Sequence, residues 1–140
     1  MRVRLPERPR RPRDSCAVER HESTAVVLVD ATGTIRHWSE GAVVLFGHID
    51  PVGDMLDVIV PEALRERHWN GFHRAMATGE SPISGGRMNI PVRCADGEER
   101  SFPGTFTVLW DGHRRPIGAI GIWSERRGDE EPFSSIEPLP

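Results

Sequence analysis

Residues 60–79 read VPEALRERHWNGFHRAMATG, and they have the features of one long helix in a chain that otherwise predicts short strands. Pro61 suits the first helical turn, where its missing N–H would have no partner, and Gly79 suits the left-handed position just past a helix end. Four residues share one stripe of this helix: Leu64, His68, Phe72 and Ala75. Because a mostly apolar stripe faces the interior, His68 is expected to point inward.

An inward imidazole has two interpretations, which the helical pattern leaves open. His68 is either a hydrogen-bonded core residue or the ligand of a metal or cofactor. His73 lies five positions further on, about 140° around the helix, so both rings cannot reach one iron from one face. His73 is therefore predicted at the surface or at a dimer face, and it is the runner-up ligand.

Composition restricts the classes of function. The 140 residues carry a formal charge of −3, which argues against a general nucleic-acid binder. All 18 basic residues are arginine, so Schiff-base chemistry, which needs a lysine amine, is excluded. Two cysteines, Cys16 and Cys94, have neither the number nor the spacing of a disulfide framework or a zinc site. No apolar run approaches the about 20 residues of a membrane span, and the sequence predicts a soluble, cytoplasmic protein.

The remaining segments predict an antiparallel sheet. Residues 24–30 and 34–38 form a predicted hairpin around Gly33, and Ser39 caps a predicted helix over residues 40–46. Three further strands are predicted after the long helix, over residues 87–93, 100–110 and 117–124. This order predicts an α+β fold, a five-stranded antiparallel sheet with helices covering one face. A ligand would then lie between the long helix and the sheet.

Three regions are expected along the chain. Residues 1–22 form a basic arm rich in Arg and Pro, largely disordered, in which residues 14–22 favour a short helix. Residues 23–125 form the folded domain, and residues 126–140 form an acidic, Pro-rich tail. A solvated arm is favoured over an arm that binds nucleic acid or a lipid surface.

Several short motifs, taken in their order and spacing, resemble a PAS domain over residues 23–125. They are DATGTI at residues 30–35 with Trp38, LFG at 45–47, TGE at 78–80, DG at 96–97 and the closing strand at 118–123. The resemblance implies a sensory or interaction module that holds haem, flavin, a small metabolite or no ligand at all.

The long helix is similar to that of the haem-binding branch, which includes oxygen-sensing PAS histidine kinases. RERH at residues 65–68, with Arg74 six positions after the histidine, carries this likeness. The resemblance implies that His68 is the axial ligand of a haem b iron and that Arg74 meets a haem propionate. The residues expected to line the cofactor site are Phe72, Ile90, Phe106 and Val108.

Two residues compete for the distal side of such a haem. The oxygen sensors place an arginine on the strand after this helix, where it donates to bound dioxygen. The local Gly-Gly-Arg sequence favours Arg87 for this position, whereas alternation along residues 87–93 puts Met88 inward and Arg87 on the opposite face. Met88 would be an apolar lid or a thioether sixth ligand, and an inward Arg87 would hold dioxygen or an anionic substrate. The alternation favours Met88.

Two classes of function follow from the resemblance. In size, single domain and candidate histidine, the chain is similar to the haem-PAS N-nitroglycine lyases, which break N-nitroglycine into glyoxylate, nitrite and ammonium. This implies a haem-dependent, nitrite-releasing lyase with Arg87 and Met88 as its catalytic residues. The alternative is a haem-based gas or redox sensor, or an interaction module without catalysis. The lack of a recognisable output domain favours the enzyme, and a homodimer is expected in either case.

Overall fold

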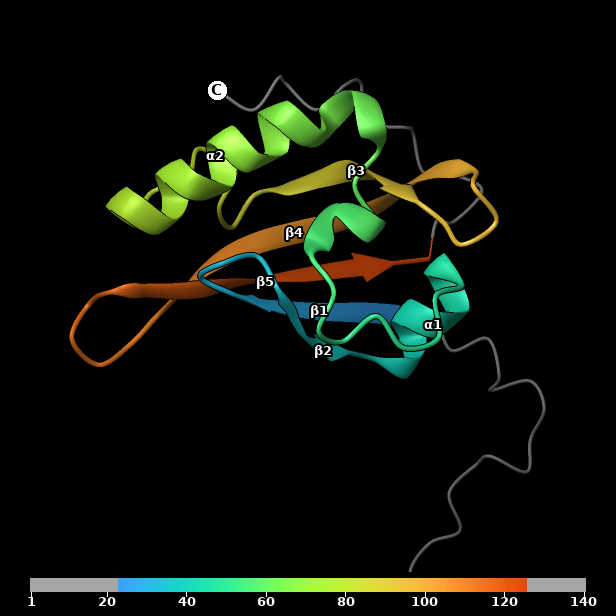
Figure 1. The fold of residues 1–140 in the computed structure, drawn as a ribbon, viewed down its shortest axis with the longest axis horizontal. Coiled ribbons are helices and arrows are strands. Elements are labelled where there is room, and N and C mark those ends of the chain that lie inside the picture. Colours follow the sequence, from blue (N-terminus) through green and yellow to red (C-terminus); the bar gives the residue numbers. More distant parts are fainter. Residues whose placement is uncertain (1–22, 126–140) are drawn as a thin grey trace, which may run out of the picture.

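Five strands and two α-helices are present in residues 23–125, the part of the chain that the computed structural model describes (Figure 1). The strands are β1 (Thr24–Asp30), β2 (Ile35–Trp38), β3 (Arg87–Arg93), β4 (Glu99–Trp110) and β5 (Pro116–Ser124). The helices are α1 (Glu40–Phe46), the 3₁₀-helices η3 (Leu56–Val58) and η4 (Glu62–Leu64), and α2 (Arg65–Thr78). Within residues 23–125, none of these helices combines the length and the apolar character that crossing a membrane requires. The predicted basic arm over residues 1–22, its helix over 14–22 and the tail over 126–140 lie outside the described residues.

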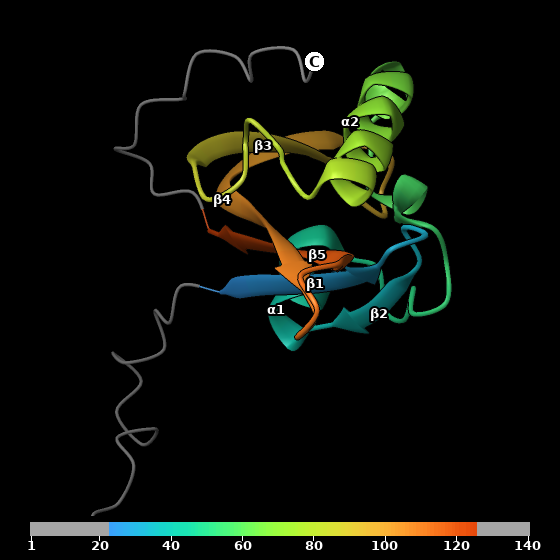
Figure 2. The ribbon, with the colours of Figure 1, turned by 90° about the vertical axis from the view of Figure 1, so that its left-hand side faces the viewer.

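The strands form one sheet in the order β2-β1-β5-β4-β3, and every neighbouring pair is antiparallel. The last strand therefore lies in the middle of the sheet, and Thr24 is opposite Ser124. Figures 1 and 2 show α1 beside β1, and the strand with which α2 makes its main contacts is β5. The predicted α+β fold, with a five-stranded antiparallel sheet and helices over one face, is confirmed.

One core joins the covered face of the sheet to both helices. Alternate residues of β1 are buried because successive strand side chains point to opposite faces: Ala25, Val27 and Val29. Phe46 of α1 packs between Phe102 and Trp123, with ring centroids 5.4 and 5.2 Å away. Phe72 of α2 belongs to the same cluster. The sheet face opposite these residues is the one without helices.

α1 begins and ends where the sequence predicts. The hydroxyl of Ser39 accepts hydrogen bonds from the backbone N–H of Ala42 at 3.2 Å and of Val26 at 2.8 Å, so one cap also ties the helix to β1. Gly47 ends the helix with a left-handed φ of 85°, and its N–H donates to the carbonyl of Val43.

The long helix begins later than predicted and ends as predicted. Pro61 precedes the short η4, and the regular α-helix begins at Arg65. Gly79 has a φ of 76°, and its N–H donates to the Ala75 carbonyl at 2.7 Å. A Cβ on Gly79 would overlap the indole of Trp110. Trp110 thus covers the end of α2, and this position at the margin of the fold leaves its side chain 46% exposed.

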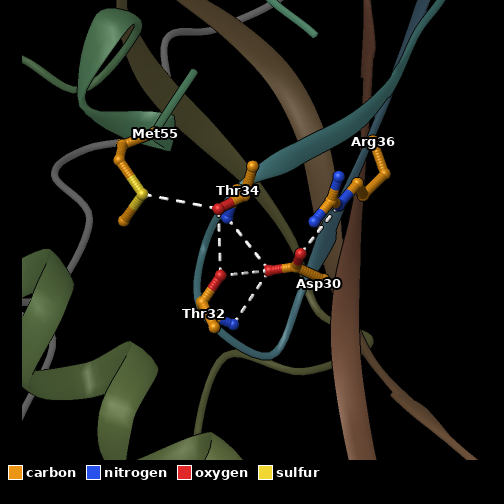
Figure 3. A network of polar contacts seen from close by, with 5 residues as sticks. All are labelled: Asp30, Thr32, Thr34, Arg36 and Met55. Carbon is orange, nitrogen blue, oxygen red and sulfur yellow. Dashed lines mark hydrogen bonds and ion pairs between the residues drawn. The ribbon is translucent and has the colours of Figure 1, made fainter. Parts of the chain in front are cut away.

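A polar network fixes the β1–β2 turn (Figure 3). One carboxylate oxygen of Asp30 accepts from the Thr32 hydroxyl at 2.6 Å and from the backbone N–H groups of Thr32 and Thr34. The other oxygen pairs with Arg36 at 2.8 Å. These hydrogen bonds, the Thr32 hydroxyl first, hold the pKa of Asp30 well below its usual range. The Thr34 hydroxyl donates to the Met55 sulfur, so the network links the turn to the segment before η3.

Candidate functional site

The position of His68 on α2 places its ring between the helix and the sheet. The residue is half-buried, and it lies on the wall of two separate hollows of the structure. Its Nδ1 atom is buried and has no hydrogen-bond partner within residues 23–125. A buried polar atom without a partner is uncommon in folded proteins, and it marks a place where a ligand would supply the missing interaction.

Aromatic neighbours hold the imidazole in place. The ring of Phe72, one helical turn further on, stacks on it at 6.1 Å with an interplanar angle of 21°. The indole of Trp69 meets it edge-on at 5.1 Å. Trp69 is itself fixed, because its Nε1–H donates to the carboxylate of Asp57 in η3 and its ring packs on Gly33 in the β1–β2 turn. The orientation of His68 therefore depends on η3 and on the first hairpin as well as on α2.

Burial keeps His68 uncharged near neutral pH. Loss of solvation lowers the pKa of His68 from 6.5 to about 4, against a smaller opposite effect of the Asp57 carboxylate. His73 acts on His68 in the same direction as burial. A neutral imidazole has a free lone pair, which is the form that binds a metal or accepts a hydrogen bond.

The larger hollow has a volume of about 330 Å³ and lies between β3, the start of α2 and the two 3₁₀-helices. Its walls are mostly apolar and include Leu64, Met88 and Ile90. Arg67 is the one charged residue on this wall among residues 23–125. The volume is at the lower end of the range of small-molecule sites, about 300–1,000 Å³.

The smaller hollow has a volume of about 80 Å³ and lies between the second half of α2 and strands β1, β4 and β5. Val29 and Val108 contribute apolar wall, whereas Arg74 and Glu80 are the charged wall residues within the described chain. Five residues border both hollows: Leu56, His68, Ile83, Phe106 and Trp123. His68 is therefore one of the residues that separate the two hollows.

The structure brings together most of the residues that the sequence assigns to a site. Phe72, Arg74 and Val108 line the smaller hollow, and Met88 and Ile90 line the larger one. His68 and Phe106 line both. Arg87 is exposed at the start of β3 and lines neither hollow. His73, the runner-up ligand, is exposed and stacks on Trp69 at 5.7 Å.

Two of the wall residues that were not assigned from the sequence are Ile83 and Arg67. Ile83 follows α2 and borders both hollows. The segment is held on β4, since the N–H of Gly85 donates to the Phe106 carbonyl at 2.7 Å and the Ser84 hydroxyl accepts from the Val108 N–H at 3.4 Å. Arg67 is the second. Its place beside His68 was a possible signal, but helical periodicity alone puts it on the solvent side.

The described residues contain no cluster of three or more His, Cys, Asp or Glu side chains that would hold a metal ion. Cys94 is buried, and its thiol lies 4.0 Å from the carbonyl oxygens of Leu45 and Val92. A metal in the space beside His68 would therefore need to bring most of its ligands with it.

Comparison with known proteins shows similarity both in sequence and in structure. No family model matches the chain. An uncharacterized protein of Azorhizobium caulinodans is 34% identical over 87 residues, which are 60% of this chain. The chain spans only 12% of the length of that relative.

The similar solved structures include PAS and LOV domains. A PAS domain from Colwellia psychrerythraea has a TM-score of 0.60 at 19% identity, over 71% of this chain and 83% of that one. The PAS-B domain of Drosophila melanogaster Cycle, with bound ethylene glycol, has a TM-score of 0.56 at 11% identity, over 72% of this chain and 97% of that one. The LOV domain of the blue-light photoreceptor Aureochrome1 has a TM-score of 0.54 at 17% identity, over 90% of this chain and 91% of that one.

These likenesses agree with the sheet order and with the helices that cover one face of the sheet. Residues 23–125 of this chain have the fold of a PAS domain.

Proposed function

We propose that this chain is a PAS module that binds haem b between α2 and the sheet, with His68 as the axial iron ligand, and that it senses a gas or the redox state. One observation carries the proposal: a buried, unpartnered ring nitrogen belongs to a histidine on the wall of two mostly apolar hollows. Leaving such a group without a partner costs about 1–3 kcal/mol. A ligand that bonds to Nδ1 offsets this cost.

The donor chemistry supports a haem. The pKa of His68, lowered to about 4, leaves the imidazole neutral near pH 7, which is the form that coordinates iron. Within residues 23–125 no cluster of donors is present for a bare metal ion. A porphyrin brings its own nitrogen ligands and needs a single donor from the protein, which His68 provides.

The surrounding residues have distinct roles in this proposal. His68 would ligate the iron, and Arg74, on the wall of the smaller hollow, would meet a propionate. The apolar contacts would come from Phe72, Met88, Ile90, Phe106 and Val108. When bound, haem supplies an iron that changes redox state and binds small gases.

Haem titration of the purified protein tests the proposal. We expect the wild type to bind haem at one equivalent with a strong Soret band, and His68→Ala to lose that band. His73→Ala is the matched control, because His73 lies on the same helix but is exposed. A wild type without a Soret band, or a band that survives in His68→Ala, would show that His68 does not hold a haem.

Sensing is favoured over catalysis by the side chains on the two walls. Met88 lines the larger hollow, whereas Arg87, the arginine expected to hold an anionic substrate, is exposed and lines neither hollow. One observation favours the second candidate, a nitrite-releasing reaction on a small nitro compound. Arg74 borders the smaller hollow, where it would orient a carboxylate or nitro group beside His68.

The two candidates differ in turnover. Dithionite-reduced, haem-loaded protein would be mixed with N-nitroglycine, and released nitrite measured against a haem-only control. Nitrite release that is lost in Arg74→Gln at full haem loading would support the enzyme. Tight binding of carbon monoxide or nitric oxide without nitrite release would support the sensor.

A sensor also needs a surface that passes its state to another chain, and the predicted homodimer would provide one. Ile122 of β5 is 40% exposed on the sheet face opposite the buried Trp123, where a second copy would cover it. Sedimentation of the wild type and of Ile122→Glu, with and without haem, measures this assembly. A monomer under every condition would contradict the homodimer.

A further inference from the structure

We propose that the larger hollow takes a ligand with an apolar body and an anionic group, and that Arg67 at its margin binds that anion as a carboxylate. The inference rests on the proposed function in that it uses the same hollow, and it adds the ligand class and a specificity-determining residue. Haem is one member of this class, but the argument holds for any apolar carboxylate.

The wall of the larger hollow separates apolar from charged groups. The side chains of Leu64, Met88 and Ile90 offer only carbon and sulfur to a ligand, and the uncharged polar side chains on this wall are those of His68, Asn89 and Ser101. Arg67 is the one charged residue on the wall within residues 23–125, and it is exposed. A ligand therefore meets an apolar interior and a single positive charge next to solvent.

The guanidinium of Arg67 is available to a ligand. No ion pair and no hydrogen bond of this side chain occurs among the described residues. By contrast, Arg65 on the same helix donates to the carbonyl oxygens of Val60 and Asp57. The planar guanidinium of an arginine matches a carboxylate with two parallel hydrogen bonds, which a neutral ester or amide cannot form in the same way.

The helix fixes how such a ligand would lie. Arg67 and His68 are consecutive residues of α2, so their side chains leave the helix about 100° apart. His68 borders the hollow from within, and Arg67 borders it at the solvent side. A carboxylate on Arg67 would thus direct the apolar body of its ligand inward, toward the imidazole.

Two probe pairs test the role of Arg67. The first is 2-naphthoate against methyl 2-naphthoate, with binding followed by calorimetry. The second is haemin against haemin dimethyl ester, followed by the Soret band and by the rate of haem transfer to apomyoglobin. The variants are Arg67→Gln, the charge-conserving Arg67→Lys, and Arg93→Gln, an exposed arginine of β3 that lines neither hollow.

We expect the wild type to prefer 2-naphthoate over its ester, and Arg67→Gln to lose about fivefold in affinity for the carboxylate, as for a partly exposed ion pair. Haemin should leave Arg67→Gln faster than the wild type while the Soret band keeps its position, since His68 remains. Arg67→Lys should recover part of both effects, and Arg93→Gln should behave as the wild type.

The two proposals fail in different ways. If haemin does not bind but 2-naphthoate binds through Arg67, the haem assignment is wrong and the carboxylate site stands. If haemin binds through His68 while Arg67→Gln and Arg93→Gln act alike with both probes, the role of Arg67 is refuted. Equal binding of each acid and its ester by the wild type would refute it as well.

Discussion

Replacing His68 by Phe should make the ligand-free protein more resistant to acid. The phenyl ring keeps the stacking with Phe72 and removes both the titrating group and the buried nitrogen without a partner. In the unfolded chain a histidine takes up a proton as the pH falls below about 6.5, whereas in the folded protein the pKa of His68 is lowered to about 4. Between these values the unfolded state holds the additional proton, so the wild type loses stability as the pH falls.

The size of this effect follows from the two pKa values. One proton exchanged over one pH unit corresponds to about 1.4 kcal/mol, so His68 should cost the wild type about 3 kcal/mol between neutral pH and about pH 4. The contribution of His68 is fully present above pH 6.5 and falls no further below about pH 4. At neutral pH, His68→Phe should be as stable as the wild type or more stable, by up to about 1–3 kcal/mol, because no buried nitrogen remains unpartnered.

Urea denaturation of the haem-free proteins between about pH 7.5 and about pH 4.5, at constant ionic strength, measures this difference. Carboxylates titrate equally in the wild type and the variant, so subtracting one unfolding free energy from the other isolates His68. The exposed His73→Phe on the same helix is the matched control and should keep most of the acid sensitivity. A difference between wild type and His68→Phe that does not change with pH would refute the reasoning, since it would mean that the imidazole at position 68 faces water.

Three further changes test the elements that hold the site in place. Asp30→Ala removes the acceptor of the turn network and the ion pair with Arg36, and it should lower the free energy of unfolding by about 1–2 kcal/mol. Because the pKa of Asp30 is lowered in the folded state, this loss of stability should be seen near neutral pH and should shrink in strong acid. Ser39→Ala should cost about 1 kcal/mol in urea denaturation, and Ser39→Thr should recover part of it, because the hydroxyl caps α1. Gly79→Ala should lower the free energy of unfolding by more than about 1 kcal/mol, because the new Cβ would sit on a left-handed backbone and overlap Trp110. The substitution should also change the fluorescence of the tryptophans. An unchanged midpoint of urea denaturation would contradict this packing.

The haem and carboxylate experiments examine the ligand, whereas these stability measurements examine the empty protein. The two sets inform each other. If His68→Phe stabilises the ligand-free protein and also abolishes haem binding, the buried imidazole is retained at a cost in stability, as expected of a functional residue.

The local sequence was sufficient for most of the secondary structure. The cap at Ser39, the left-handed Gly79 and the inward Ile90 and Val92 of β3 depend on residues within a few positions of one another, and each appears where the sequence predicts it. The helical stripe also predicted that His68 is directed inward, because the period of the helix assigns the faces before any partner is known. The start of α2 differs from the prediction, since η4 intervenes between Pro61 and Arg65.

The shape of the site was decided by the tertiary structure. Strand β5 lies between β1 and β4, and this pairing of the ends of the domain brings Trp123 and Phe106 to the wall shared by the two hollows. Ile83 and Arg67 are among the wall residues that the sequence did not assign, and they border a space that exists only where α2 and its following segment do not fill the volume above the sheet. Periodicity and capping are properties of neighbours along the chain, whereas an unfilled volume depends on side chains far apart in sequence. The sequence therefore determined that an imidazole points inward, and tertiary packing decided what space that imidazole meets.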